Sequence, residues 1–404
     1  MGASLPVVRV PCSGKVVGQR EKELMHEAVD DGWLTAGRWN ADFEEGLAKA
    51  TGAAWAATVN SGSSANLVAI SALGLQPGDE VITVAAGFPT TVNPILLAGA
   101  TPVFVDVDIP TYNVDVAALE AAVTPKTRAI VLAHTLGNPF DVDLVREICR
   151  RHRLRLIEDC CDALGATYAG IGVGTFGDYG TLSFYPAHQI TTGEGGAVFS
   201  RIHDRVAAES IRDWGRDCYC APGASNTCGE RFTQKHGDLP YGYDHKFVYS
   251  RLGYNLKMTD MQAACGVAQL ESLPGFVAKR RENWSYLRKR LETCAEFLIL
   301  PEATPYSEPS WFGFAMTMTD ACDFARHNLT SYLAQEGVDS RNLFGGNLTR
   351  QPYMQGRNFR ISGELKNTDI ITERTFWIGC WPGLGEEQLE YAADRIETFL
   401  GVSD

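Results

Sequence analysis

"DEVITVAAGFPTTVNPILLAGATPVFVDVD", residues 79–108, reads as a strand, a helix and a second strand in succession. Residues 79–87 and 101–108 are short, apolar and rich in β-branched side chains, which is typical of strands buried on both faces of a parallel sheet. Residues 89–99 have the composition of a helix. Two such strands joined by a helix predict the crossover unit from which α/β folds are built.

The same alternation continues on both sides of this stretch. We expect helices at 61–75, around 114–122 and at 141–151, and strands at 128–134, 154–160 and 180–184. From about residue 250 the pattern changes to a long helix at 258–292, strand-like pieces and a last helix at 385–400. The sequence therefore predicts a large domain over 1–255 and a smaller C-terminal domain over 256–404. The stretch 212–249 is rich in Gly, Asp and Cys and fits neither period, which is typical of a functional or disordered insertion.

Composition excludes several classes of protein. Of the 404 residues 45% are hydrophobic and 21% charged, as in ordinary soluble globular proteins. The net charge of −13 argues against a nucleic-acid-binding protein, but a small phosphorylated substrate needs only a few local donors. No apolar run approaches the roughly 18 residues of a membrane span, and "MGASLPVVRV" lacks the features of a signal peptide. We therefore expect a cytoplasmic protein with no membrane partner.

The stretch "SFYPAHQITTGEGGAV", residues 183–198, resembles a cofactor loop with an unusual residue at its centre. An enzyme that uses pyridoxal phosphate (PLP) would place a lysine here, to hold the aldehyde as a Schiff base. This chain has His188, which cannot form that bond. With an unperturbed pKa of about 6.5, a histidine is suited to proton transfer near neutral pH.

Two further segments suit the same cofactor. "NSGSSAN", residues 60–66, opens a helix, and its N–H groups could bind a phosphate or simply be capped. Asp159 ends the strand "LRLIED", where a carboxylate could face a protonated pyridine nitrogen or cap the next turn. The residues alone leave both alternatives open in each case.

Taken in this order, the segments resemble the DegT/DnrJ/EryC/StrS sugar aminotransferase family. The resemblance covers nearly the whole chain, from "DGWLTAGRWNADFEEGLAKATG" (31–52) to the closing helix. It implies the aspartate-aminotransferase-like fold (PLP fold type I), in which a mainly parallel seven-stranded large domain is followed by a smaller C-terminal domain. It also implies a homodimer.

The resemblance also implies roles for individual residues. The cofactor phosphate, the pyridine ring, its nitrogen and its 3-hydroxyl group are each expected to have a partner in this chain. Asn255 would reach the phosphate across the dimer interface, and Asp162, where aminotransferases commonly carry Gln, would contact the 3-hydroxyl or the surroundings of a cluster. The full expected set is Gly62, Ser63 and Ser183 at the phosphate, Phe88 on the ring, Asp159 at the nitrogen, and Asp162 and Asn255.

Within this family, histidine in place of the lysine is the mark of the sugar 3-dehydrases. The resemblance therefore implies that His188 is the catalytic base and that the cofactor is held non-covalently, most usefully as pyridoxamine 5′-phosphate (PMP). The reaction would remove the C3 hydroxyl of a nucleotide-linked 4-keto-6-deoxyhexose. Such a step belongs to deoxysugar biosynthesis, including that of lipopolysaccharide O-antigens.

Cysteines distinguish two kinds of 3-dehydrase. "DCYCAPGASNTC" contains Cys218, Cys220 and Cys228, and Cys160 follows Asp159. Four such thiolates could hold an iron–sulfur cluster or zinc, or could be free thiols. Their pattern, C-x57-C-x-C-x7-C, resembles the [2Fe–2S] motif of the CDP-4-keto-6-deoxy-D-glucose 3-dehydrases, and residues 340–355 resemble the C-terminal substrate region of that branch.

That branch couples dehydration to reduction in 3,6-dideoxysugar biosynthesis and receives electrons from a separate iron–sulfur flavin reductase. Cys161 is left out of the expected ligand set because it faces the opposite way to Cys160 in an extended chain. Candidates for the substrate diphosphate, each of which could equally be an ordinary surface residue, are Arg212, Arg216, Arg341 and Arg350.

Two alternative functions stay open from the sequence. One is a cluster-free dehydratase that takes its amine from glutamate. The other is a catalytically silent homologue whose four cysteines bind zinc. Family analogy favours cytidine as the nucleotide, but thymidine-linked substrates occur in close relatives.

Overall fold

The computed structural model describes residues 8–203 and 205–402, and within them a central twisted sheet is built from eight strands. The expected absence of a signal peptide and the predicted start of the large domain at residue 1 both involve residues 1–7, which lie outside this described part. Strand order is β1-β9-β8-β5-β4-β2-β3-β14. The strands are β1 (Trp55–Val59), β2 (Glu80–Val84), β3 (Thr101–Val105), β4 (Thr127–Ala133), β5 (Arg155–Asp159), β8 (Tyr179–Ser183), β9 (Gly196–Ser200) and β14 (Arg360–Ile361).

Most neighbours in this sheet are parallel. Only β9 runs antiparallel to both strands beside it, β1 and β8. The predicted mainly parallel α/β fold is confirmed. The expected seven strands are joined by the two-residue β14, which comes from the C-terminal part of the chain and pairs with β3.

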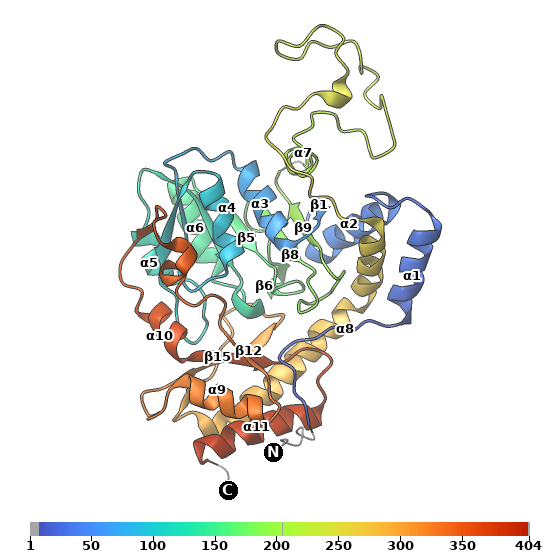
Figure 1. The fold of residues 1–404 in the computed structure, drawn as a ribbon. Helices are drawn as coiled ribbons and strands as arrows, with labels where there is room; N and C mark the ends of the chain where they lie inside the picture. Colours follow the sequence, from blue (N-terminus) through green and yellow to red (C-terminus); the bar gives the residue numbers. More distant parts are fainter. Residues whose placement is uncertain (1–7, 204, 403–404) are drawn as a thin grey trace.

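Helices cover both faces of the sheet because successive strand residues point to opposite sides. Val81 and Val131 pack on one face and Ile82 and Ile130 on the other. The first face carries α3 (Gly62–Ala72), α4 (Pro89–Leu97) and α7 (Val206–Arg212). The second carries α2 (Arg38–Thr51), α5 (Val116–Ala121), α6 (Val142–His152) and the first half of α8 (Asp260–Arg290) (Figure 1).

A second hydrophobic core lies below the large sheet in the view of Figure 1. It is formed on a four-stranded sheet of order β10-β12-β15-β13 by the end of α8 and two further helices. The strands are β10 (Leu298–Ile299), β12 (Gly313–Met318), β15 (Thr375–Gly379) and β13 (Ser340–Asn342), and the helices are α9 (Arg326–Gln335) and α11 (Glu386–Leu400). A short helix, α10 (Lys366–Arg374), leads into β15, and a small sheet combines β11 (Ser307–Glu308), β6 (Thr167–Tyr168) and β7 (Ile171–Gly172).

The long helix α8 joins the two cores. Its residue Ala264 packs in the large core and its residue Leu287 in the small one. The helix α1 (Gln19–Asp30) packs along α8, whereas Val10 joins the small core. The predicted boundary at residue 255 remains a prediction.

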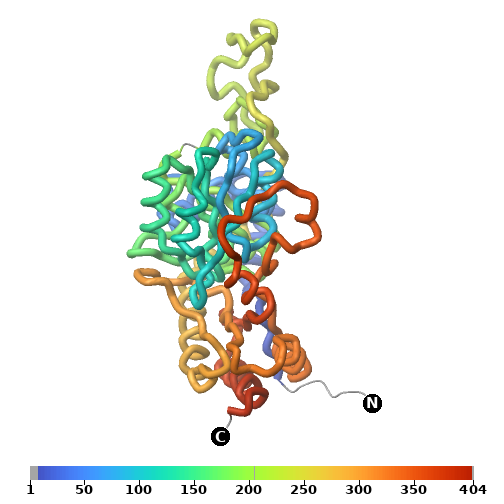
Figure 2. The backbone as a smooth tube through the Cα atoms, turned by 90° about the vertical axis from the view of Figure 1, so that its left-hand side faces the viewer, coloured from blue at the N-terminus to red at the C-terminus, as the bar shows by residue number. Residues whose placement is uncertain are grey.

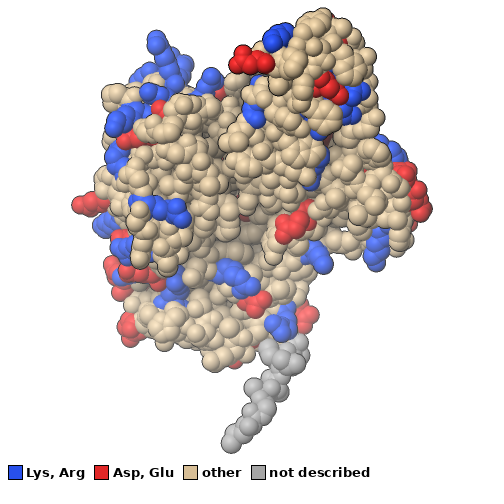
Figure 3. All heavy atoms as spheres, turned by 45° about the horizontal axis from the view of Figure 1, so that its top comes forward, with Lys and Arg blue, Asp and Glu red and all other residues tan. Residues whose placement is uncertain are grey.

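Residues 216–249 form an irregular arm that projects from the body of the molecule, as both views of the backbone show (Figures 1 and 2). An isolated antiparallel bridge between Arg216 and Tyr249 closes its base. Within it, one 3-10 turn is formed by His245–Phe247. Nothing in the described part of the chain is a helix long and apolar enough to cross a bilayer. Acidic and basic side chains are interspersed on the face drawn in Figure 3, which shows no continuous basic surface.

Candidate cofactor and substrate site

A cavity of about 600 Å³ lies at the carboxyl edge of the large sheet, where ligands of α/β proteins bind. The ends of β5 and β8, the turn before α4 and the first turn of α3 supply one side. Residues of the C-terminal part supply the other. Of the residues predicted for the cofactor and for catalysis, seven line it: Gly62, Ser63, Phe88, Asp159, Asp162, Ser183 and His188.

The start of α3 is shaped as a phosphate cradle. Ser61 caps the helix and accepts a hydrogen bond from the N–H of Ser64, which leaves the first N–H groups free to face the cavity. A Cβ placed on Gly62 would lie 2.5 Å from Cβ of Ser183, so only glycine keeps this space open. These donors, with the Ser183 hydroxyl, suit the phosphate of PLP or PMP.

Asp159 is held firmly at the end of β5. Its Oδ2 accepts hydrogen bonds from Asn66 Nδ2 at 2.8 Å and from Thr91 Oγ1 at 2.7 Å, and its Oδ1 accepts one from the N–H of Cys161 at 3.1 Å. Its side chain faces the cavity that Phe88 also lines. A carboxylate fixed in this way suits the protonated nitrogen of a pyridine ring.

His188 lies in the segment between β8 and β9 and is next to Asp162. The Nδ1 atom of His188 lies 3.2 Å from Oδ1 of Asp162, within ion-pair distance. The angle does not allow a hydrogen bond, so this buried Nδ1 has no hydrogen-bond partner among the described residues. Asp162 therefore contacts the predicted base, a role that the sequence did not indicate.

A buried arginine supports the loop that carries His188. Arg280 on α8 is 1% exposed, and its guanidinium donates to the carbonyl oxygens of His188 at 3.1 Å and Trp311 at 3.1 Å. Its side chain joins the cofactor loop to the strand region before β12. Sequence reasoning missed it because an arginine in a long helix is usually a surface residue.

The other side of the cavity is aromatic. It is lined by Phe312, Phe344 and Trp377, with Arg341 and Asn342 beside them. The rings of Phe312 and Trp377 lie 5.4 Å apart. No sequence motif identified these rings, because they come together from three separate segments of the C-terminal part.

Only one of the four predicted diphosphate arginines, Arg341, lines the cavity. Arg212 is 8% exposed and bonds to Glu44 and Thr58, so its prediction as a substrate residue is corrected to a structural one. Arg216 stacks over the ring of Trp214 at the base of the arm. Arg350 is exposed and forms an ion pair with Asp369 at 2.6 Å. Neither of the last two lines the cavity, and their expected contact with the diphosphate stays a prediction.

Asn255 does not line the cavity of its own chain. Its side chain is exposed and accepts a hydrogen bond from Lys257 at 2.8 Å, and its backbone bridges to Asp213. Its expected place at the phosphate of a partner subunit stays a prediction.

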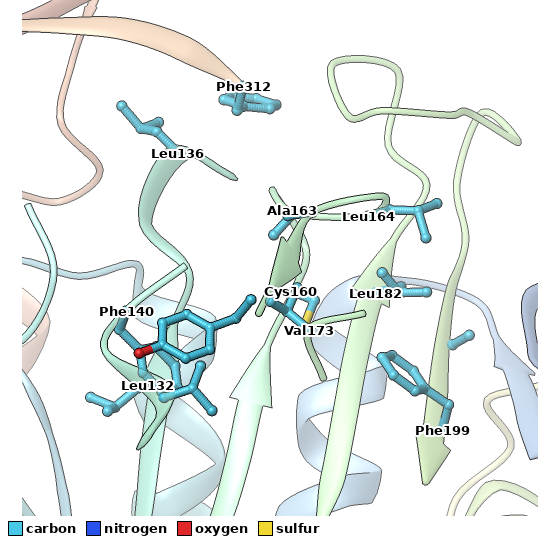
Figure 4. Packing of buried hydrophobic residues seen from close by; sticks show 14 of the residues in the cluster. Leu132, Leu136, Phe140, Cys160, Ala163, Leu164, Val173, Leu182, Phe199 and Phe312 are labelled. Atoms are coloured by element: carbon cyan, nitrogen blue, oxygen red, sulfur yellow. The ribbon is translucent and has the colours of Figure 1, made fainter. Parts of the chain in front are cut away.

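The four predicted metal ligands do not come together. Cys160 is 1% exposed, and Figure 4 shows its sulfur within the apolar cluster that includes Val173, Leu182 and Phe199. Cys161 lines the cofactor cavity instead. In an extended chain Cys161 points to the same side as Asp159, and Cys160 points to the opposite side. The choice of Cys160 as a metal ligand stays a prediction.

The remaining three cysteines lie in the arm. Cys218 and Cys220 are neighbours, and Cys228 Sγ lies 3.8 Å from Nδ1 of His245. His245 in turn lies 2.9 Å from Oδ2 of Asp217. Across residues 8–203 and 205–402, no group of three or more His, Cys, Asp or Glu side chains is arranged to hold a metal ion. The residues present therefore fit PLP or PMP, and the predicted four-cysteine set does not fit a cluster.

Comparisons with known proteins identify relatives that match nearly the whole chain. The chain is 58% identical to the lipopolysaccharide biosynthesis protein RfbH of Salmonella typhimurium over 403 residues, covering 98% of this chain and 92% of that protein. It is 48% identical to the dTDP-4-dehydro-2,6-dideoxy-D-glucose 3-dehydratase of Saccharopolyspora spinosa over 400 residues, covering 97% of this chain and 86% of that protein.

A solved structure shares the fold over its full length. It is that of Escherichia coli GDP-4-keto-6-deoxy-D-mannose-3-dehydratase with bound hydrated PLP, with a TM-score of 0.87 and 28% identity over 97% of this chain and 100% of that one. The sequence pattern of one family matches residues 15–397. The chain belongs to the DegT/DnrJ/EryC1/StrS aminotransferase family, whose fold is that of the PLP fold-type I enzymes.

Proposed function

We propose that this protein is a PMP-dependent 3-dehydratase that removes the C3 hydroxyl of a nucleotide-linked 4-keto-6-deoxyhexose. The observation that carries the proposal is His188, which lies in the cofactor cavity at the place of the family's lysine. The names of two relatives support the reaction class, since both are 3-dehydratases of nucleotide sugars.

Separate residues of the chain would bind the phosphate, hold the ring nitrogen and transfer the proton. The first N–H groups of α3 and the Ser183 hydroxyl would hold the phosphate, and Asp159 would hold the ring nitrogen in its protonated state. PMP, when bound, supplies an amine for the keto group of the sugar and an electron-withdrawing ring. His188 would take a proton at Nε2, because Nδ1 faces Asp162. Asp162 stabilises the resulting imidazolium by its negative charge.

The test exchanges His188 for residues of known chemistry. His188→Asn removes the base and should lower the dehydration rate by about 10²–10⁴-fold while PMP still binds. His188→Lys should also abolish dehydration and instead bind PLP covalently, which an absorption band that resists dialysis would reveal. A His188→Asn protein that dehydrates CDP- or dTDP-4-keto-6-deoxyglucose at the normal rate would remove His188 from the mechanism.

The reductive form of the reaction, with a [2Fe–2S] cluster and a partner reductase, is supported by the C-x57-C-x-C-x7-C pattern and by the resemblance of residues 340–355 to that branch. The Cys160 thiol lies in the apolar core, and it does not group with the three arm cysteines within residues 8–203 and 205–402. Iron and sulfide assays on protein purified without oxygen test this part. About two irons and two sulfides per chain would establish a [2Fe–2S] cluster.

Iron-free protein whose turnover needs glutamate would instead establish the cluster-free dehydratase. Cys161→Ser and Cys160→Ser, compared in the same assay, would show which of the adjacent thiols matters. Iron lost from Cys161→Ser and kept in Cys160→Ser would identify Cys161, which lines the cavity, as the ligand. The opposite result would identify Cys160 as the ligand. Zinc without any bound cofactor would leave the chain a catalytically silent homologue.

A further inference from the structure

Phe344 has a backbone conformation that aromatic residues rarely adopt. It follows β13 in "NLFGGN", residues 342–347, and its φ is +46°. The left-handed region is disfavoured for a bulky L-residue and costs stability wherever it occurs. Gly346, two residues later, has a φ of +58°, which glycine adopts without a steric penalty. The chain thus keeps an aromatic ring at a position where glycine would be less strained.

Contacts on both sides of Phe344 hold this conformation. The N–H of Gly345 donates to the carbonyl oxygen of Gly87 at 3.0 Å, and the N–H of Leu348 to that of Ala85 at 2.9 Å. Leu343 is 1% exposed, so the residue before Phe344 is anchored in the core. The loop therefore crosses from the small core to the turn before α4 and delivers the Phe344 ring to the cavity mouth.

The Phe344 ring lies in the wall of the cavity. Phe344 lines the cavity, and its centroid lies 6.2 Å from that of Phe88 in an edge-to-face arrangement of 73°. Phe88 is the residue expected to cover the cofactor ring, so Phe344 lies next to the expected cofactor position. Phe312 and Trp377 also line the cavity, and the Phe312 ring lies 5.3 Å from that of His188.

We propose that Phe344 is a specificity-determining residue that packs against an apolar C–H face of the substrate's deoxyhexose. The proposal rests on the proposed function, and it explains why a strained aromatic residue is kept. A 6-deoxyhexose presents a methyl group and ring C–H bonds as apolar surface, which an aromatic ring shields from water. Since this contact is not with the reacting atoms, it strengthens substrate binding with little effect on the chemical step.

The experiment compares Phe344→Ala, Phe344→Gly and Phe344→Leu in the PMP-loaded full chain, with CDP- and dTDP-4-keto-6-deoxyglucose as probes. The alanine and glycine variants should each raise KM by about tenfold with kcat within about threefold of the wild type. PMP binding should stay unchanged. The glycine variant should melt above the alanine variant, because glycine relieves the positive φ.

Tyr306 provides a matched control outside the cavity. Its φ is +66° and its side chain is 80% exposed. Tyr306→Gly should also melt above Tyr306→Ala, with KM at the wild-type value for both. A rise in KM for the Tyr306 variants would show that relief of strain, and not the Phe344 ring, changes substrate binding, and would overturn the proposal.

Other outcomes are equally decisive. An unchanged KM in Phe344→Ala, or wild-type behaviour of Phe344→Leu, would overturn a role for the ring. Loss of PMP binding together with substrate binding would make Phe344 a cofactor residue and overturn the proposal as well. If the wild type binds a probe without dehydrating it, the proposed function fails. The role of Phe344 is then decided by the ratio of the probe Kd of Phe344→Ala to that of the wild type. A wild type that binds neither probe would overturn both.

Discussion

The hydroxyl of Thr91, in the first turn of α4, donates a 2.7 Å hydrogen bond to the carboxylate of Asp159 at the end of β5. This bond links two elements that meet only at the carboxyl edge of the sheet. Because Asp159 is expected to bind the cofactor ring, its hydrogen-bond partners should affect cofactor affinity through the position of this carboxylate.

Thr91→Val should therefore weaken PMP binding by about tenfold, since hydrogen bonds to a charged group are worth about 1.5–3 kcal/mol. Titration of the apoprotein with PMP, followed by absorption or protein fluorescence, measures the effect. Thr330→Val on the outer face of α9, whose hydroxyl bonds only within its own helix, is the control. Equal affinity of the Thr91 and Thr330 variants would show that this bond does not organise the site.

Arg280→Met should lower both kcat and thermal stability. The substitution leaves the carbonyl oxygens of His188 and Trp311 without their buried donor, at a cost of about 1–3 kcal/mol for each group left unsatisfied. Thermal melts and kcat, measured with PMP saturating, test this. Arg281→Met is the matched control on the same helix, because Arg281 is partly exposed and donates to Pro309 and Glu308. Arg280→Lys should retain part of the stability that Arg280→Met loses. A wild-type kcat in Arg280→Met would refute a positioning role.

The cysteines should differ sharply in reactivity in metal-free protein. Burial raises the pKa of Cys160 and of Cys161 well above the ordinary value, and nearby carboxylates raise both further. A hydrogen bond from Thr227 is the largest cause that lowers the pKa of Cys220 to about 7. Brief iodoacetamide treatment at pH 7.5, followed by peptide mass spectrometry, should label Cys220 and leave Cys160 and Cys161, with their raised pKa, unmodified. Unfolded protein, in which all thiols react alike, is the control, and fast labelling of Cys160 would place it outside the core.

Stability should depend on pH through Glu80. Burial raises the pKa of this carboxyl, but hydrogen bonds from Arg360 and Thr124 outweigh burial and the net pKa is lowered. A carboxyl whose pKa is depressed by folding stabilises the protein above its unfolded pKa of about 4.3, and this stabilisation is lost as the pH falls through the folded pKa. Glu80→Gln should thus lower the free energy of unfolding by about 1–3 kcal/mol at pH 7 and by much less near pH 3.5. Urea unfolding at both pH values measures the difference, and an equal loss at both would show that the charge of Glu80 is irrelevant.

Much of the large sheet and its helices could be predicted from local patterns. The strand predicted at 154–160 is β5 (Arg155–Asp159), and the helix predicted at 258–292 is α8 (Asp260–Arg290). These elements have strong periodicity and clear caps, so their ends differ by only a few residues. The short β14 could not be predicted, because its two residues pair with β3 only through the tertiary fold.

The site was predictable where a motif fixes it, and not where several segments converge. The cradle of Gly62 and Ser183 and the positions of Asp159 and His188 follow from local motifs. The sequence indicated that Cys160 and Cys161 face opposite ways, but it did not show that Cys161 lines the cavity while Cys160 lies in the apolar core. Arginines such as Arg212 carry no local signal that separates a buried ion pair from a substrate contact.

The arm joins the body through two strands of backbone that already lie side by side at Arg216 and Tyr249. A tight two-residue turn can connect such neighbours, so we expect the body to fold when residues 217–248 are replaced by Asn-Gly. The arm also lies against the body at Gly223, where an added Cβ would come within 3.1 Å of the Trp33 ring. Exchanging the arm between relatives would show whether the role of its three cysteines moves with the arm or depends on the cavity.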